Sequence, residues 1–567
     1  MRRLLAVILL VLSLAPASAQ VDDTESLAFP TSGSAAAQPH FLRAVAFLHS
    51  FGWKQAIAEF REAQKLQPDF AMAYWGETLC YNHPLVSEQD AKSPRKALVR
   101  LAPTPAERLA KAPTDREKGL LQAVEVLWGE GDWRTRRVGY MNAMERLARQ
   151  YPDDDEAQTF YALALLSGAH ALRDDTFRYQ VRAGAIALEV SRRNPTHPGA
   201  LHYTIHAFDD PIHAPLALAA ATTYAALVPD VSHAVHMPTH IFIQLGMWNE
   251  VADQNVRAFD VARDLFQPGD DPSDLAHSGD WGQYGFLQLG DYAGARDRTA
   301  ALGAASAQSK SPRLLRAAEL TRARYVVETE EWIVQPVAED AMAETVFANG
   351  MSAIHTGDRA VAAQMLGDLA RRVERRSAAP ADPHMEHGVP ADQPADPEPD
   401  STGAAAVPGT PFVAAADQAE APALGPSDPD GSAPVPTRGR DAVRRIMHDE
   451  LAAMIAMTED RRDEGIALLT QAAEIESGMP PPSGPADPIK PAHELLGEAL
   501  LAAGRPEEAA AAFDASLLRM PNRHRSLLGA ARAYAASGNG VLAESRYQTL
   551  MSFWRGPVPA APGTLAQ

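Results

Sequence analysis

The sequence is poor in cysteine and in positive charge, and each shortage excludes a class of protein. A single cysteine, Cys80, among 567 residues excludes an internal disulfide framework and a zinc site built from thiolates. We expect Cys80 to be a small buried residue and not a reactive thiol. Lysine and arginine number 52 against 72 aspartates and glutamates, a formal charge of −20. This acidic balance argues against nucleic acid or an anionic membrane as a partner, since both need a basic footprint.

Long apolar runs and the common catalytic motifs are also missing. Beyond the N-terminal segment, no stretch reaches the roughly 18 uninterrupted apolar residues of a membrane helix, so no membrane insertion is expected after that segment is cleaved. There is no HExxH, GxSxG, Walker A or complete GxGxxG motif, and His493-Glu494 lacks the second histidine of HExxH. Whether the protein is an enzyme stays open at this point, with a non-enzyme favoured.

The first residues read as a secretory signal peptide. Arg2 and Arg3 form a basic start, an apolar core follows, and Ala17-Ser18-Ala19 is a typical cleavage site. We expect residues 1–19 to be removed and the mature protein to be exported, either periplasmic or secreted.

A repeat of about 34 residues at the C-terminal end predicts the fold. Characteristic positions of the repeat hold an L-G pair, small residues, an aromatic residue and a closing proline. In the first unit these are Leu496-Gly497, Leu500, Ala509, Phe513, Ser516 and Pro521. A second unit repeats part of the pattern at Ala531, Tyr534, Ala543 and Tyr547. The same template fits a segment near the N-terminus, at Ala44, Phe47, Ala56, Phe60, Ala63 and Pro68. Leu245-Gly246 and Leu289-Gly290 are interpreted as opening two further A helices. The pattern predicts an all-α tetratricopeptide-repeat superhelix, a solenoid of helix–turn–helix units.

One segment interrupts the helical pattern. Residues 377–440 are mostly Pro, Ala, Asp and Gly, a composition that cannot bury enough apolar surface to fold, so a disordered linker is predicted. The predicted organisation is therefore a signal peptide (1–19), an N-terminal helical array (20–376), this linker (377–440) and a C-terminal array (441–567). His384 and His387 lie in the linker and are expected to be solvated.

Two histidine-rich strings, 202–211 and 233–240, are the strongest sign of chemistry, with His213 between them. His202 and His206 are four apart, so one helix face presents two imidazoles. His236 and His240 share this spacing, but Pro238 is expected to begin a helix and leave His236 on the turn before it. We expect three successive A helices to bring five histidines to one groove, namely His202, His206, His236, His240 and His277. Three carboxylates are candidates to complete the site or orient the rings, namely Asp209, Asp210 and Asp280.

An all-imidazole site suits Zn, Cu, Fe or Ni. Only neutral imidazole binds a metal, so affinity is expected to fall as the pH drops through about 6.5. The alternative is that the same histidines line a polar groove or are structural.

The chain also resembles a family of exported bacterial tetratricopeptide-repeat proteins for which no activity is settled. The specific strings are Ala71-Met72-Ala73-Tyr74-Trp75-Gly76 and His236-Met237-Pro238-Thr239-His240-Ile241-Phe242, the AMAYWG and HMP[ST]HI[FY] motifs. The resemblance implies a repeat fold and export, and it adds His49 and His83 as motif residues, for which packing is an equally open role. The long linker departs from the family pattern.

Two function classes remain open from the sequence. The first is an exported scaffold that binds a protein, a peptide or a small ligand in its concave groove. The second is a metal-binding protein or metalloenzyme with its site on three successive A helices.

Overall fold

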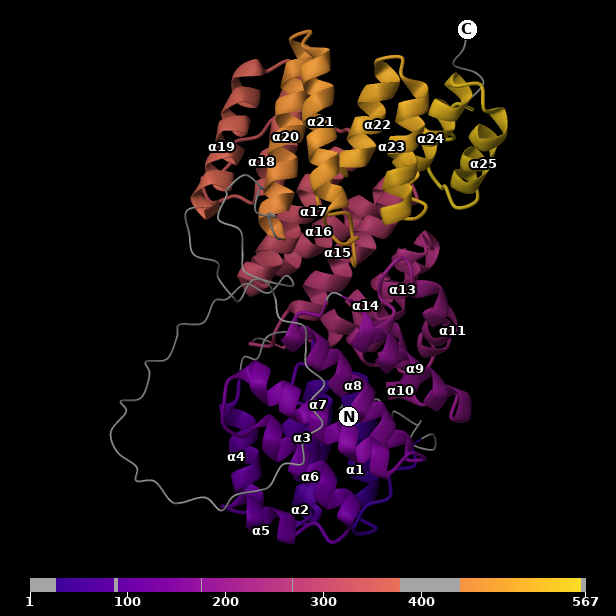
Figure 1. The fold of residues 1–567 in the computed structure, drawn as a ribbon. Helices are drawn as coiled ribbons and strands as arrows, with labels where there is room; N and C mark the ends of the chain where they lie inside the picture. Colours follow the sequence, from indigo (N-terminus) through magenta and orange to yellow (C-terminus); the bar gives the residue numbers. More distant parts are fainter. Residues whose placement is uncertain (1–26, 86–89, 175, 268, 378–438, 562–567) are drawn as a thin grey trace, which may run out of the picture.

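The computed structural model describes residues 27–85, 90–174, 176–267, 269–377 and 439–561, and these form α-helices joined by turns and loops, without a β-strand (Figure 1). The predicted signal peptide (1–19) and nearly all of the predicted linker (377–440) lie outside the described residues. The helices of the first half are α1 (Gln38–His49), α2 (Trp53–Leu66), α3 (Ala71–Leu79), α4 (Lys92–Leu101), α5 (Pro105–Ala110), α6 (Asp115–Leu127), α7 (Trp133–Gln150), α8 (Asp155–Leu172), α9 (Arg178–Arg193), α10 (Pro198–Ala207), α11 (Ala214–Tyr224), α12 (Ser232–His236) and α13 (Pro238–Gln244). Those of the second half are α14 (Trp248–Leu265), α15 (Ser273–Gln288), α16 (Tyr292–Ser309), α17 (Pro312–Thr329), α18 (Ala343–Thr356), α19 (Arg359–Ser377), α20 (Arg440–Thr458), α21 (Arg462–Ser477), α22 (Ala492–Ala502), α23 (Pro506–Arg519), α24 (His524–Ala536) and α25 (Gly540–Met551).

The predicted fold class is confirmed: helices adjacent in the sequence pack against each other along the chain, which makes a helical-repeat superhelix. The packing of the C-terminal repeat explains why glycine and an aromatic residue occupy fixed positions in its sequence. A Cβ atom at Gly497 would lie 2.9 Å from the Phe513 ring, and one at Gly529 would lie 2.3 Å from it. Phe513 on α23 can therefore pack closely against α22 and α24, because Gly497 and Gly529 have no side chain in the space that its ring fills.

The interpretation of two Leu-Gly pairs is wrong. Leu245-Gly246 and Leu289-Gly290 end α13 and α15 instead of opening A helices. Gly246 has φ +64° and Gly290 has φ +71°, the left-handed conformation that terminates a helix and that glycine adopts without strain.

The helices on either side of residues 378–438 belong to one core. α19 packs against α20, and α18 also packs against α20. Phe347 of α18, Leu369 of α19 and Leu451 of α20 lie in one buried apolar cluster. The array therefore continues in space from the N-terminal part into the C-terminal part.

The C-terminal helices also contact the middle of the chain. In Figure 1, α20 to α25 are drawn above α15, α16 and α17. Arg523 is fully buried there and pairs with Glu328 at 2.7 Å and with Glu494 at 2.8 Å. Trp248 of α14 donates from Nε1 to the carbonyl oxygen of Asn522, 2.8 Å away. These long-range contacts hold the C-terminal helices against the segment that carries the histidines.

Cys80 is buried and its Sγ lies 3.4 Å from the Gly76 carbonyl oxygen, as expected of a small packing residue. Burial raises the pKa of its thiol well above the usual value. Within the described ranges, no helix combines the length and apolar character needed to cross a membrane.

Candidate metal centre

Six histidines from α10, α12, α13 and α15 gather in two groups of three. The inner histidine group is His202, His206 and His233, and the outer histidine group is His236, His240 and His277. In each group the three potential ligand atoms lie within 4.8 Å of one another. The helices come together because α10 packs on α13, and α12 packs on both α13 and α15.

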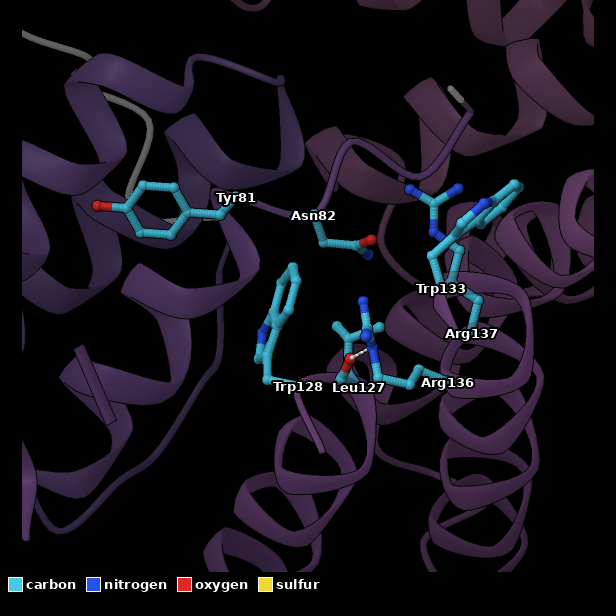
Figure 2. Close-up of a pocket in the computed structure, with 7 residues that line it drawn as sticks. All are labelled: Tyr81, Asn82, Leu127, Trp128, Trp133, Arg136 and Arg137. Atoms are coloured by element: carbon cyan, nitrogen blue, oxygen red, sulfur yellow. Dashed lines mark hydrogen bonds between the residues drawn. The ribbon is translucent and has the colours of Figure 1, made fainter. Parts of the chain in front are cut away.

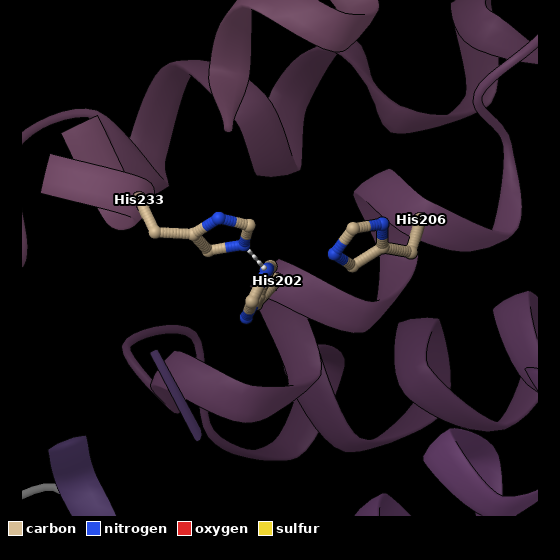
Figure 3. Close-up of side chains that lie close together, drawn as sticks. All are labelled: His202, His206 and His233. Carbon is tan, nitrogen blue, oxygen red and sulfur yellow. Dashed lines mark hydrogen bonds between the residues drawn. The ribbon is translucent and has the colours of Figure 1, made fainter. Parts of the chain in front are cut away.

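Figure 3 shows the inner group, with the rings of His206 and His233 on either side of His202. His202 donates from Nδ1 to the backbone carbonyl oxygen of His49, 2.6 Å away. A carbonyl oxygen can only accept, so the neutral ring of His202 carries its proton on Nδ1 and a lone pair on Nε2. That Nε2 lies 3.2 Å from Nε2 of His233. Nε2 of His206 is buried without a hydrogen-bond partner among the described residues.

Phe51 contacts all three rings of the inner group. Its centroid lies 4.5 Å from the ring of His202, 5.6 Å from that of His206 and 5.0 Å from that of His233. Its backbone has φ 55°, a conformation that bulky residues avoid. Strain of this kind persists where the surroundings over-determine it, and it concentrates at functional sites.

The outer group contains two rings whose tautomers are set by their neighbours. Nδ2 of Asn255 donates to the Val251 carbonyl oxygen at 2.8 Å, so its Oδ1 faces His236 and accepts the Nδ1 proton of that ring at 2.6 Å. His240 donates from Nδ1 to Oδ2 of Asp209, also at 2.6 Å. Nε2 of His236 lies 3.1 Å from Nε2 of His240. Both atoms carry lone pairs in the neutral rings, so they repel unless a proton or a metal ion lies between them.

Trp281 covers the outer group as Phe51 covers the inner one. Its ring lies 4.9 Å from that of His236, 4.5 Å from that of His240 and 5.0 Å from that of His277. A Cβ atom at Gly484, in the loop between α21 and α22, would lie 2.7 Å from Trp281. The C-terminal part of the chain therefore helps to position the aromatic cover of this group.

Burial keeps the rings of His202, His206 and His236 neutral. Burial is the largest cause that lowers the pKa of His202 to about 3 and places the pKa of His206 well below its usual value. Burial and the neighbouring His277 and His240 rings lower the pKa of His236 in the same way. Neutral imidazole is the form that binds metal ions.

The spacing of the rings fits metal ligation. Two ligands about 2.0–2.1 Å from a tetrahedral zinc ion are about 3.3–3.4 Å apart. The two Nε2–Nε2 distances, 3.2 Å and 3.1 Å, are close to this separation. Each group offers three ring nitrogens, and three such ligands on a four-coordinate ion would leave one position for water or another ligand, as in catalytic zinc sites.

A third group, His49, Glu156 and His197, has the same ligand spacing and is fully buried, but it differs in containing a carboxylate that lies against both of its histidines. Nδ1 of His197 accepts from the backbone N–H of Ala200 at 3.2 Å, so Nε2 carries the proton and faces Oε1 of Glu156 at 3.4 Å. His49 lies 2.8 Å from Oε2 of Glu156 through Nε2, and its Nδ1 is 3.0 Å from the hydroxyl of Tyr203. Burial would raise the pKa of Glu156, but the two adjacent histidines outweigh it and hold that pKa far below its usual value. His49 and Glu156 are thus a buried hydrogen-bonded pair that reaches the inner group through the carbonyl oxygen of His49.

The structure places the five sequence-predicted ligands in two groups and adds His233. His202 and His206 lie on α10, His236 and His240 on α12 and α13, and His277 on α15. His233 was missed because residues before Pro238 were expected to form a turn. Met237 instead has φ −51° and ψ −40°, so α12 runs almost directly into α13. A helix over 232–236 would have placed His233 one turn before His236.

The three carboxylates predicted to support the site have different partners in the structure. Asp209 does orient a ring, through His240. Asp210 instead accepts from Nδ1 of His213 at 2.7 Å, and Asp280 pairs with Arg324 at 2.6 Å. The expectation that Asp210 and Asp280 serve the five predicted rings is therefore corrected: one shapes the turn after α10, and the other neutralises a buried guanidinium.

The two motif histidines have different places. His49 supports the inner group through its carbonyl oxygen. The ring of His83 stacks on Trp53 at 5.4 Å, and Trp53 stacks on Phe51 at 4.5 Å. His83 thus belongs to an aromatic stack that leads to the inner group.

Figure 2 shows a separate hollow lined by Tyr81, Asn82, Leu127, Trp128, Trp133, Arg136 and Arg137. Arg136 donates to the carbonyl oxygens of Leu127 at 3.0 Å and Gly131 at 2.7 Å. None of the residues lining this hollow is one of the six histidines, and the enclosed space, about 10 Å³, is of the order of a single water molecule and too small for an ordinary ligand.

Comparisons with known proteins give distant structural similarity. No family model and no curated protein match the chain. The human IFIT1 dimer with m7Gppp-AAAA aligns with a TM-score of 0.33 and 12% identity over 94% of this chain and 92% of that one. The APC/C hetero-tetramer Cut9–Hcn1 aligns at 0.28 and 11% identity over 93% and 75%, and the P58(IPK) TPR domain at 0.22 and 9% identity over 89% and 99%. Similarity this distant identifies no family, so the class of the protein rests on its own structure: an all-α helical-repeat protein with two three-histidine groups.

Proposed function

We propose that this chain is a transition-metal-binding protein and that the inner and outer histidine groups each hold a metal ion. The observation that supports this most directly is the pair His236 and His240. Each ring gives its Nδ1 proton to an oxygen atom, so two lone pairs face each other at 3.1 Å. A metal ion with about 2.0–2.1 Å bonds to both would remove the repulsion.

Imidazole ligands suit Zn, Cu, Fe or Ni, and the proposal does not depend on which of them binds. Asn255 and Asp209 hold the ligand rings in the binding tautomer, the usual role of residues behind metal-ligating histidines. Three protein ligands in each group leave room for a water molecule or a substrate on the ion.

The test is elemental analysis of the full-length chain, purified without metal-affinity resin or chelator from the compartment to which it is exported. We expect a stoichiometric transition metal in the wild type and a loss of metal in His236→Ala/His240→Ala. His384→Ala/His387→Ala is the matched control, and it should keep the metal. Wild-type protein that contains no metal and binds none when Zn²⁺ or Co²⁺ is added would refute the proposal.

A scaffold role is the second candidate, and the architecture favours it. Helical-repeat superhelices present extended surfaces on which proteins or peptides bind. Export to the periplasm or the medium remains part of the proposal, on the strength of the signal-like residues 1–19. Crosslinking in that compartment tests it: a protein crosslinked to the wild type and to His236→Ala/His240→Ala alike supports a scaffold that is independent of the metal.

A further inference from the structure

The inner and outer histidine groups are close neighbours. The ring centroids of His206 and His240 are 6.1 Å apart, although the two residues belong to different groups. His233 and His236 are three residues apart on α12, so one turn of helix carries one ring of each group. Asp209, three residues after His206, orients His240. The end of α10 therefore contributes to both groups.

The charge around these rings is unbalanced once ions bind. The six imidazoles are neutral ligands, and Asp209 is the carboxylate that the described contacts place on them. Asp280 is paired with Arg324, and Asp210 with His213. Two divalent ions beside one carboxylate leave a net charge of about +3 in a largely buried site, and buried charge is stable only when it is paired.

The site has an open side. His202 is fully buried and His236 is 3% exposed, whereas His277 is exposed at the surface of α15. Oδ1 of Asp209 is buried without a hydrogen-bond partner among the described residues, and Nε2 of His206 is in the same situation. A small ligand could thus reach ions bound beside His277. The orphaned carboxylate oxygen of Asp209 and ring nitrogen of His206 are themselves suited to a metal ion.

We propose that the two histidine groups form one binuclear centre that binds an oxoanion, a phosphate or a carboxylate, across both ions. This rests on the proposed function, since it requires both groups to hold metal. The anion supplies the negative charge that the six imidazoles lack. Two ions held close together stabilise oxygen ligands in this way in phosphatases and nucleases.

The experiment uses the full-length chain loaded with Co²⁺ after metal removal. Electron paramagnetic resonance and visible absorption are recorded with one and with two equivalents of Co²⁺. We expect two Co²⁺ per chain, and a signal that changes shape and loses intensity per ion when the second ion binds, because the ions are magnetically coupled. Inorganic phosphate and acetate are then titrated in separate arms, and a shift of the absorption bands by either one identifies the class of oxoanion.

Two matched variants separate the groups. His206→Ala/His233→Ala should hold one Co²⁺ in the outer group, and its affinity for the anion should fall by about tenfold or more, which is at least 1.4 kcal/mol. His236→Ala/His277→Ala should likewise hold one Co²⁺, in the inner group. Two uncoupled ions whose spectra do not change when phosphate or acetate is added would overturn this inference and leave the proposed function standing. A chain that takes up no Co²⁺ would overturn both.

Discussion

His202 donates its Nδ1 proton to the backbone carbonyl oxygen of His49, 2.6 Å away, across more than 150 residues of sequence. This bond sets which nitrogen of His202 is free to bind a metal. His49 is in turn held by Glu156 and by the hydroxyl of Tyr203. His202 is the one proposed ligand in this buried network, and the network fixes which of its ring nitrogens faces the inner group.

Glu156→Gln tests this network. The change removes the carboxylate that accepts from His49 and faces His197, both in buried positions. We expect the free energy of unfolding to fall by about 3–5 kcal/mol, as for one partner removed from a buried pair. The measurement is urea unfolding. Glu145→Gln, at a carboxylate paired on the surface with Arg149 and Arg182, is the control, with an expected change below about 1 kcal/mol.

Asn255→Leu removes the acceptor that fixes the tautomer of His236. The metal affinity of the outer group should drop by about 10–100-fold, the usual cost of losing a residue behind a ligating histidine. Asn255→Asp keeps an acceptor at the same place and should retain most of the affinity. Competition with a chromophoric chelator measures both variants, and equal losses in the two would show that Asn255 acts only through packing.

The pH at which metal is lost should lie below the value expected from free histidine. Burial is the main cause that lowers the pKa of His202 to about 3 and places that of His236 well below its usual value. The neutral, binding form of these rings therefore persists as the pH falls through about 6.5. We expect dialysis at about pH 5.5 to leave the metal bound, and metal content measured at a series of pH values checks this.

Although bound metal should resist acid, the stability of the metal-free protein should decrease as the pH falls. A histidine with a lowered folded pKa contributes stability that is present above about pH 6.5, the unfolded value, and is lost as the pH falls toward the folded value. The melting temperature of the metal-free chain should therefore decrease below about pH 6.5. A melting temperature that is constant from about pH 7 to pH 5 would contradict the neutral state of the buried rings.

Gly199→Ala tests the close approach of α10 and α1. The added Cβ would lie 2.3 Å from Nδ1 of His49, a contact that requires His49 to move. We expect a destabilisation of about 1–3 kcal/mol. Gly303→Ala, in α16, is the matched control: its Cβ meets no atom within 4 Å, so the helix should gain about 0.5–1 kcal/mol. Thermal unfolding of both variants measures the difference.

Local sequence patterns predicted the helical-repeat fold because each repeat packs mainly on its neighbours. The slots filled by Gly497 and Phe513 describe contacts between adjacent helices, so spacing alone reveals them. The spacing of His202 and His206 on one helix face was predictable for the same reason. The place of His233 was not, because the tendency of Pro238 to begin a helix gave no sign that the preceding residues also form one.

What the sequence by itself determined is the kind of element: helices that repeat about every 34 residues, with imidazoles at helical spacing. The tertiary structure decided which imidazoles meet. It divided the histidines into two groups, gave Asp209 to His240 while Asp280 went to Arg324, and brought the His49 carbonyl oxygen and the loop at Gly484 to the site. Periodicity reports which face of a helix a residue occupies, whereas hydrogen bonds between distant segments depend on how the whole superhelix packs, and no local pattern encodes that.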